Sequence, residues 1–302
     1  MNQQFLTELK AVTAENRIFT DEPMKKHTTF RVGGPADILV QPKGTELAAV
    51  IRLCRKYDVP YQVIGNGSNL LVGDRGIRGL VIEMLSKEDE ICVEDDCITV
   101  GAGMLLSKTA NRAAEHGLTG MEVAAGIPGS IGGAVVMNAG AYGGEMKDIL
   151  TAVTVLDQEG NEKILSAEEL ELGYRTSCIL KKGYIVTGAK IKLKHGEETA
   201  IRARMEELKK QRVEKQPLEY PSAGSTFKRP EGYFAGKLIM DAGLRGYLVG
   251  EAQVSEKHCG FVINRGNATA ADVRTLMQNV ADIVEEKFGV RLEPEVKMIG
   301  EF

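Results

Sequence analysis

The residues of this 302-residue chain that could do chemistry begin with two loops rich in glycine and small polar side chains. The stretch from Gly126 to Gly144, GIPGSIGGAVVMNAGAYGG, contains seven glycines. Such a density costs backbone entropy and suits a main chain that must turn with positive φ or approach another group closely. The other loop, GNGSN at 65–69, comes first in the chain and is called the first loop below; it lies between two apolar segments that predict strands.

The main-chain N–H groups of these two loops can converge on an anion, as expected for the pyrophosphate of a dinucleotide held without charged side chains. The first loop is not a GxGxxG fingerprint, because Leu70 occupies the last position and no helix is expected after it. Spacing alone therefore favours two structural turns over a nucleotide site.

Other catalytic patterns are missing from the sequence. Gly129-Ser130 follows Pro128 and makes no GxSxG elbow, and no Walker spacing is present. The histidines, His27, His116, His195 and His258, are scattered without ligand spacing, so we expect no metal site.

Composition excludes several classes of protein. The net charge of −4 leaves no basic face for nucleic acid. Apolar runs are too short to cross a bilayer, so no membrane insertion is expected. The N-terminus lacks the basic and apolar regions of a signal peptide, and the five cysteines form no CxxC pair. We therefore expect a cytoplasmic protein with reduced thiols.

Apolar periodicity predicts a mixture of helices and short strands that must position the two loops. A helix capped by Thr45 has the buried-face spacing Leu47, Val50, Ile51, Cys54. The N-terminus is expected to form a helical lead-in followed by a loop through Pro23. Further helices are predicted at 104–115, 199–216 and 234–242 and from Thr269 or Asp272, the last with the apolar stripe Val273, Leu276, Met277, Val280 and Ile283. Strands are predicted at 59–64, 70–72, 80–83, 91–93, 98–100, 153–157, 163–165, 189–193, 262–263 and 290–299. Ser166 and Glu169 have the spacing of a capping box for a short helix.

Six strings occur in an order that resembles one family across nearly the whole chain, from His27 to Gly300: HTTFRVGGPAD, IGNGSNLLV, AGIPGSIGGAVVMNAGAYG, YRTS, AGSTFKRP and LEPEVKMIG. The family is that of the UDP-N-acetylenolpyruvoylglucosamine reductases. The resemblance implies an α+β protein with the FAD-binding fold of the vanillyl-alcohol oxidase type. It places two FAD-binding subdomains at 1–75 and 76–198 and a C-terminal α+β substrate domain at 199–302. The short spacing between Arg175 and Ser225 is similar to that of the compact branch of the family.

The resemblance implies reduction of the enolpyruvyl group of UDP-N-acetylglucosamine enolpyruvate to UDP-N-acetylmuramate, in peptidoglycan precursor synthesis. NADPH is the implied reductant and non-covalent FAD the implied cofactor. The cofactor-binding residues would lie in the two glycine-rich stretches: Gly65, Asn66, Gly67, Ser68, Asn69, Gly126, Gly129, Ser130, Gly132, Gly133 and Asn138.

Three catalytic positions of the family fall on Arg175 in YRTS, Ser225 in AGSTF and Glu295 in EPEV. Hydride addition to the terminal carbon of the enolpyruvyl group pushes negative charge toward its carboxylate. Arg175 can stabilise that charge, and protonated Glu295 can donate a hydrogen bond to the same oxygens. Ser225 would then give its proton to the α-carbon of the basic enolate.

Four residues of the last third could meet the diphosphate of a UDP-sugar: Lys228, Arg229, Lys257 and His258. Ordinary solvated basic residues explain any one of them about equally well. Arg229 stands where the family often has asparagine, and Cys259-Gly260 departs from the more usual Ala-Asn. No oligomer is predicted.

Two other functions fit parts of the pattern. An oxygen-using flavin oxidase of the same superfamily often carries a histidine in its first flavin loop as a covalent anchor, whereas this loop is GNGSN. A non-catalytic nucleotide-sugar-binding protein would be colourless when purified, whereas a protein with bound FAD would be yellow.

Overall fold

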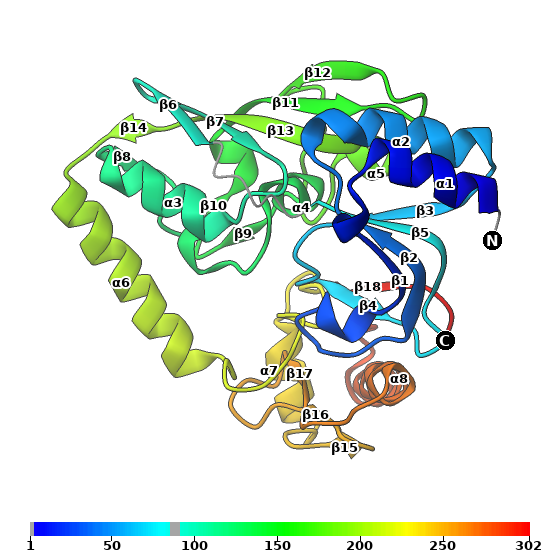
Figure 1. The fold of residues 1–302 in the computed structure, drawn as a ribbon. Coiled ribbons are helices and arrows are strands. Elements are labelled where there is room, and N and C mark those ends of the chain that lie inside the picture. The colour runs from blue at the N-terminus through cyan, green and yellow to red at the C-terminus, as the bar shows by residue number, and fades with distance from the viewer. Residues whose placement is uncertain (1–2, 85–90) are drawn as a thin grey trace. The chain divides into compact units, whose positions relative to one another are not determined.

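The computed structural model describes residues 3–84 and 91–302 and has the α+β composition that the sequence predicts (Figure 1). The chain divides into two compact units. The first takes Met1–Thr20, Ile38–Asn66 and Gly79–Gln211, and the second takes Asp21–Asp37, Gly67–Arg78 and Arg212–Phe302. Each unit thus draws on three separate segments. The boundaries after residues 75 and 198 stay a prediction.

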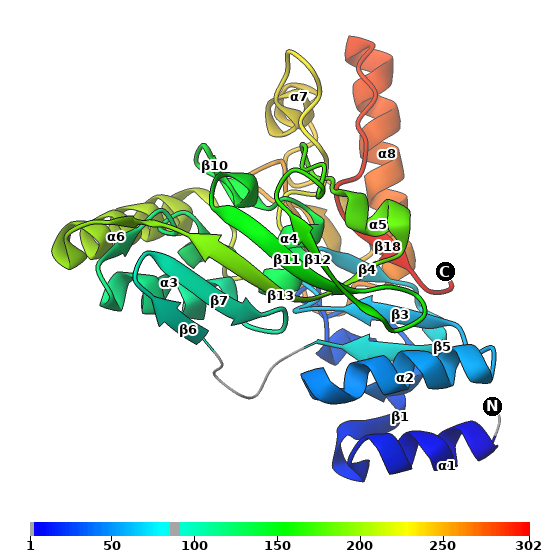
Figure 2. The same cartoon turned by 90° about the horizontal axis from the view of Figure 1, so that it is seen from above.

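A four-stranded sheet has the order β1 (Ile18–Pro23), β2 (Pro35–Val40), β5 (Ile77–Glu83) and β3 (Tyr61–Ile64). In the first unit α1 (Gln3–Val12) and α2 (Gly44–Lys56) share an apolar core with this sheet (Figure 2). The predicted face of α2 is confirmed, since all four of its apolar residues are buried. Its cap is different: the Lys43 N–H donates to Glu46 Oε2 at 2.9 Å, and Thr45 lies inside the helix. The prediction of a loop through Pro23 is wrong, because strand β1 occupies residues 18–23.

The first unit also contains a five-stranded antiparallel sheet. Its order is β12 (Glu162–Ser166), β11 (Leu150–Leu156), β13 (Ile185–Lys192), β7 (Cys97–Gly101) and β6 (Ile91–Glu94). Helices α3 (Leu106–Glu115), α4 (Ile131–Val136) and α5 (Cys178–Lys182) contribute buried apolar residues to the core of this sheet. Ser166 and Glu169 do exchange capping-box hydrogen bonds, but the residues after them form turns and no helix. The long helix α6 (Glu198–Lys215) follows.

Short elements complete the first unit. Two small ladders pair β8 (Leu118–Thr119) with β14 (Lys194–His195) and β9 (Gly140–Ala141) with β10 (Gly144–Glu145). Single 3-10 turns are η1 (Glu15–Arg17), η3 (Ala124–Gly126) and η4 (Met146–Asp148).

The second unit surrounds α8 (Ala270–Phe288). Of its predicted stripe, Val273, Leu276, Met277 and Val280 are buried, whereas Ile283 is only half-buried. A three-stranded sheet of β15 (Leu248–Val249), β16 (Ala252–Val254) and β17 (Val262–Asn264) and the helix α7 (Ala235–Asp241) complete its core. The short turn η2 (Met24–Lys26) also belongs to this unit. Strand β4 (Leu70–Val72) pairs in parallel with β18 (Lys297–Ile299). The predicted strand over 290–299 is therefore limited to its last three residues, and Pro294 instead forms an isolated bridge with Phe227.

No helix in the described part of the chain is both long and apolar enough to cross a membrane.

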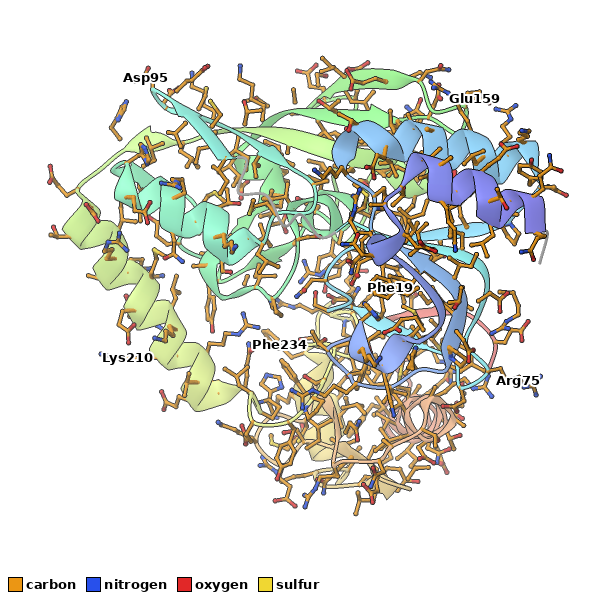
Figure 3. All side chains as sticks on the ribbon, viewed as in Figure 1. Phe19, Arg75, Asp95, Glu159, Lys210 and Phe234 are labelled. Carbon is orange, nitrogen blue, oxygen red and sulfur yellow. The ribbon has the colours of Figure 1, made fainter. Side chains whose placement is uncertain are left out.

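The turn of the β11–β12 hairpin depends on the carboxylate of Asp157. Its Oδ1 accepts hydrogen bonds from the N–H groups of Glu159 (labelled in Figure 3) and Asn161 at 3.0 and 2.9 Å. The Asn161 N–H and the other donors, including Lys163, lower the pKa of Asp157 to about 2. Because this pKa is depressed, the stabilisation is complete above the ordinary aspartate value and is lost as the pH falls toward 2.

We therefore expect Asp157→Asn to lower the urea midpoint of unfolding at pH 6 and to lower it by a smaller amount at pH 3, because the stabilisation is lost between the ordinary aspartate pKa and about 2. Asp95→Asn, in the exposed β6–β7 turn (Figure 3), serves as the matched control. Equal differences between Asp157→Asn and wild type at both pH values would rule out this role of the carboxylate.

Candidate functional site

The two glycine-rich loops that the sequence singles out meet in the first unit. The side-chain amide of Asn66 donates to the carbonyl of Pro128 at 2.7 Å. A Cβ at Gly65 would lie 2.2 Å from Ser130 Oγ, so only glycine fits there without displacing that hydroxyl. The structure thus brings 65–66 against 128–130, although the two segments are far apart in sequence.

The first loop offers donors that the protein itself does not use. Among the described residues, no acceptor receives a hydrogen bond from the main-chain N–H groups of 65–69. Gly67, in the second unit, has φ +60°, and a Cβ there would lie 1.9 Å from the carbonyl oxygen of His27. A run of main-chain N–H groups without protein acceptors suits an anion when it lies in a turn. The loop therefore has main-chain donors of the kind that a phosphate group requires.

The second loop uses its donors differently. Ser130 caps α4, where its Oγ accepts from the Gly133 N–H at 3.4 Å. The N–H groups of Ile131 and Gly132 donate at 2.8 Å to the carbonyls of Met104 and Ala102. A contribution of Gly132 and Gly133 to a cofactor site would thus rest on close approach of the main chain.

Helix α4 itself is an element that our reading of the sequence missed. Its two adjacent glycines have poor helix propensity, which hides it from a composition-based prediction. Ser130 directly before Ile131, with Ala134 and Val135 at i+3 and i+4, is the capping and periodicity signal that could have found it.

We expect Gly65→Ala to weaken FAD binding by at least tenfold, because its Cβ must displace the buried Ser130 hydroxyl. Titration of the apoprotein with FAD, followed by flavin fluorescence, measures the effect. The double variant Gly65→Ala/Ser130→Ala removes the clashing oxygen and should bind FAD more tightly than Gly65→Ala alone. No recovery in the double variant would show that this contact does not limit binding.

Arg175 lies in a tight turn of the first unit. Gly173 and Thr176 exchange main-chain hydrogen bonds of 3.1 and 3.3 Å across this turn, and Arg175 has a positive φ of 54°. Its guanidinium donates to the carbonyl of Gly140 at 3.3 Å and lies 5.2 Å from the ring centroid of Tyr174. The turn therefore holds a half-buried cation beside the second half of the glycine-rich stretch.

Asn138 is part of the same region and is fully buried. Its side-chain amide and carbonyl make three hydrogen bonds, all to protein groups.

Ser225 and Glu295 belong to the second unit, where one residue links them. The Glu295 N–H donates at 2.8 Å to the carbonyl of Thr226, the neighbour of Ser225. Asn69, from the first glycine-rich loop, donates its side-chain amide at 3.2 Å to the Glu295 carbonyl. Ser225 is exposed, and Glu295 is half-buried.

Thr29 and Thr226 are functional candidates that the sequence reasoning did not single out. The Thr29 hydroxyl donates to the Ser222 carbonyl at 2.6 Å, and its N–H donates to the Gly67 carbonyl at 3.3 Å. Thr29 thus ties the first loop to the segment that leads to Ser225. Both threonines stand within recognisable motifs, but their partners are distant in sequence, so spacing could not reveal them.

The four basic candidates also lie in the second unit. Lys228 pairs with Glu293 at 2.8 Å, and the Arg229 guanidinium lies 4.0 Å from the ring centroid of Phe234. Lys257 donates to the carbonyl of Val213 at 2.7 Å. Burial lowers the pKa of His258, whose Nδ1 accepts from the Gly260 N–H at 3.1 Å. His258 therefore offers a neutral ring at pH 7.

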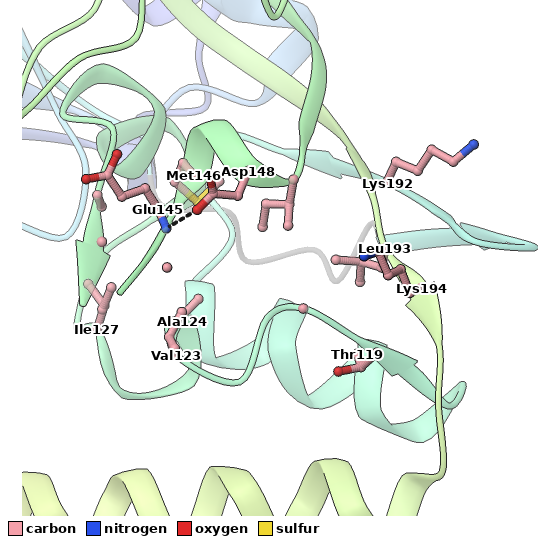
Figure 4. A pocket seen from close by; sticks show the side chains of 15 residues that line it. Thr119, Val123, Ala124, Ile127, Glu145, Met146, Asp148, Lys192, Leu193 and Lys194 are labelled. Carbon is pink, nitrogen blue, oxygen red and sulfur yellow. Dashed lines mark hydrogen bonds between the residues drawn. The ribbon is translucent and has the colours of Figure 1, made fainter. Parts of the chain in front are cut away.

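A cavity of about 360 Å³ lies in the first unit, next to the segment after Asn138 (Figure 4). Gly140 and Glu145 line it, together with apolar residues such as Val123 and Ile127. The Glu145 N–H donates to Asp148 Oδ2 at 2.8 Å at its edge (Figure 4). None of the predicted cofactor-binding residues is part of its lining.

Comparison with known proteins finds a matching family model in each half of the chain. A model of an FAD binding domain matches residues 36–166, and a model of the C-terminal domain of UDP-N-acetylenolpyruvoylglucosamine reductase matches 216–299. Proteins named UDP-N-acetylenolpyruvoylglucosamine reductase are 57% identical in Agathobacter rectalis, over 100% of both chains, and 56% identical in Lachnoclostridium phytofermentans, over 100% of this chain and 99% of the relative. The crystal structure of UDP-N-acetylenolpyruvylglucosamine reductase from Thermus caldophilus superposes with a TM-score of 0.78 at 41% identity, covering 91% of this chain and 97% of that one.

Proposed function

The chain belongs to the UDP-N-acetylenolpyruvoylglucosamine reductase family. We propose which of its residues bind the cofactor, which bind the substrate and which act in catalysis. The activity is the FAD-dependent reduction of the family, with NADPH as reductant, in peptidoglycan precursor synthesis. The substrate that we assign is UDP-N-acetylglucosamine enolpyruvate and the product UDP-N-acetylmuramate. The proposed compartment is the cytoplasm, where NADPH is available.

We assign the cofactor pyrophosphate to the donors of Gly65–Asn69 and to the main chain of Gly126, Gly129, Ser130, Gly132 and Gly133. The support for this assignment is the run of N–H groups in 65–69 that have no acceptor among the described residues. When bound, FAD supplies a hydride, taken from NADPH, to the terminal carbon of the enolpyruvyl group. Any role of Asn138 beside the cofactor would have to use its main chain, since its side chain is engaged elsewhere.

We assign charge stabilisation to Arg175. Hydride addition turns the terminal methylene into a methyl group and leaves the electron pair on the α-carbon, delocalised into the carboxylate. A guanidinium keeps its charge at every physiological pH and presents a planar set of donors to two carboxylate oxygens. Arg175 can therefore stabilise this enolate, and Glu295 in its protonated form can donate to the same oxygens.

Ser225 completes the reaction by giving its hydroxyl proton to the α-carbon, and solvent then returns a proton to the serine. The single observation that carries this assignment is the hydrogen bond from the Glu295 N–H to the Thr226 carbonyl at 2.8 Å. It holds the segment of Glu295 beside the segment of Ser225, as a shared site requires.

We assign the diphosphate of the UDP-sugar to Lys228, Arg229 and Lys257, which carry positive charge, with His258 as a neutral hydrogen-bonding partner. The support for this assignment is their common location in the second unit together with Ser225 and Glu295.

Anaerobic mixing tests the proposed function. NADPH should bleach the flavin absorbance near ~450 nm, and the enolpyruvyl substrate should then restore it. UDP-N-acetylglucosamine, which lacks the enolpyruvyl group, is the control and should leave the flavin reduced. Reoxidation by oxygen but not by the enolpyruvyl substrate would overturn the assignment.

A further inference from the structure

We propose that Asn138 is a positioning residue for Arg175: its buried side chain fixes the turn that presents the guanidinium to the substrate. The inference rests on the role of Arg175 in the proposed function. It gives the Asn138 side chain a task apart from the cofactor-binding role that the resemblance implies for this residue.

The hydrogen bonds of Asn138 leave it no free donor. One amide hydrogen goes to the Gly173 carbonyl at 3.1 Å, and the other goes to Glu145 Oε2 at 2.9 Å. Its carbonyl oxygen accepts from the Lys147 N–H at 2.9 Å. An asparagine amide has two hydrogens to donate, so both are spent within the protein. Since the residue is 0% exposed, these bonds form away from water.

Gly173 is the residue at which this side chain reaches the turn of Arg175. The same Gly173 carbonyl that accepts from Asn138 also accepts from the Thr176 N–H at 3.3 Å. The guanidinium of Arg175 in turn donates to Gly140, two residues after Asn138, at 3.3 Å. Segments 138–140 and 173–176 are therefore joined by two hydrogen bonds. One runs from the Asn138 side chain to the main chain of Gly173, and the other from the Arg175 side chain to the main chain of Gly140.

The backbone conformation of Asn138 and Arg175 gives an independent reason why these two hydrogen bonds are needed. Asn138 and Arg175 have φ values of 43° and 54°, in the left-handed region that side chains disfavour. Strained residues persist only where surrounding contacts hold them, and they gather at functional sites. Asparagine tolerates this conformation better than most residues, and its amide supplies the contact that a glycine would lack.

The other hydrogen-bond acceptor of the Asn138 amide, Glu145, is a charged group. The Glu145 carboxylate that accepts from Asn138 also pairs with Lys147 at 2.8 Å. The hydrogen bond from Lys147 and that from Asn138 hold the pKa of Glu145 below its ordinary value, so the group is ionised at neutral pH. Asn138 thus lies between an anion and the turn that carries the catalytic cation.

The decisive experiment is a double-mutant cycle of Asn138→Gly and Arg175→Ala. Glycine keeps the positive φ without strain, so Asn138→Gly removes only the side chain. We expect the rate of flavin reoxidation by substrate to fall about 10- to 100-fold, as a misplaced catalytic group predicts. FAD affinity of the apoprotein, measured by fluorescence titration, should stay within about twofold of wild type. In the Arg175→Ala background, Asn138→Gly should add less than about a threefold loss, because residues that act through one another are not additive.

Asp95→Gly, a replacement of another residue with positive φ in the exposed β6–β7 turn, is the matched control and should leave all these values unchanged. Additive losses in the cycle, or an FAD affinity that falls with the rate, would overturn the positioning role. If Arg175→Ala itself left reoxidation by substrate intact, the proposed function of Arg175 would fail instead, so the two failures can be told apart.

Discussion

Replacing Ser225 by alanine should abolish reoxidation of the reduced flavin by the enolpyruvyl substrate while leaving its reduction by NADPH intact. The hydroxyl is the proton donor that we assign to the α-carbon, and a positioned general acid contributes about 10²- to 10⁴-fold in rate. The exposed Ser225 side chain can be shortened without opening a buried cavity, so the fold should be unaffected. Stopped-flow absorbance at the flavin band measures the two half-reactions separately.

Ser222→Ala is the matched control for that variant, in the same loop. The carbonyl of Ser222 accepts from the Thr29 hydroxyl, and this main-chain contact survives the substitution. We expect wild-type rates in both half-reactions. If Ser225→Ala also kept both half-reactions, the proton must come from another group, and the assignment would be wrong.

Replacing Arg175 by alanine should lower kcat/KM for the enolpyruvyl substrate by about 10²- to 10³-fold, the usual effect of removing one donor from a site of developing charge. Arg175→Lys should recover only part of this loss, since an ammonium keeps the charge but lacks the planar fork of donors. Steady-state kinetics with NADPH saturating measure both variants.

Arg202→Lys, on the exposed face of α6, is the control for exchange of the two basic side chains and should change nothing. FAD content should match wild type in all three variants. If Arg175→Ala and wild type had similar kcat/KM values, Arg175 would not be a catalytic residue. This conclusion would hold for any result with Ser225→Ala.

The strongest periodic patterns predicted their elements well. The faces of α2 and α8 are buried at the residues expected, apart from the half-buried Ile283, because apolar spacing over several turns leaves a helix only one way to face a core. The strands predicted at 153–157 and 163–165 overlap β11 and β12, which pair as a hairpin.

Short or mixed patterns failed for a physical reason. The two-glycine start of α4 has little local preference for helix, so its buried face and the Ser130 cap decide its conformation. Strand β1 occupies a segment whose local pattern was read as a loop, because its pairing partner lies elsewhere in the chain. The residues before β18 were read as a strand but lie outside any ladder, apart from the isolated bridge at Pro294.

The sequence by itself determined the chemistry available to this protein: two glycine-rich loops, an arginine, a serine and a glutamate, in an order that identifies the family. Only the tertiary structure decided which of their hydrogen-bonding groups already have partners within the protein. The main-chain N–H groups of 65–69 have no acceptor among the described residues, whereas the N–H of Gly132 and the side-chain amide of Asn138 are engaged within the protein. The reason is that each partner, such as Ala102 or Gly173, comes from a distant segment that folding brings close, and no local pattern records that pairing.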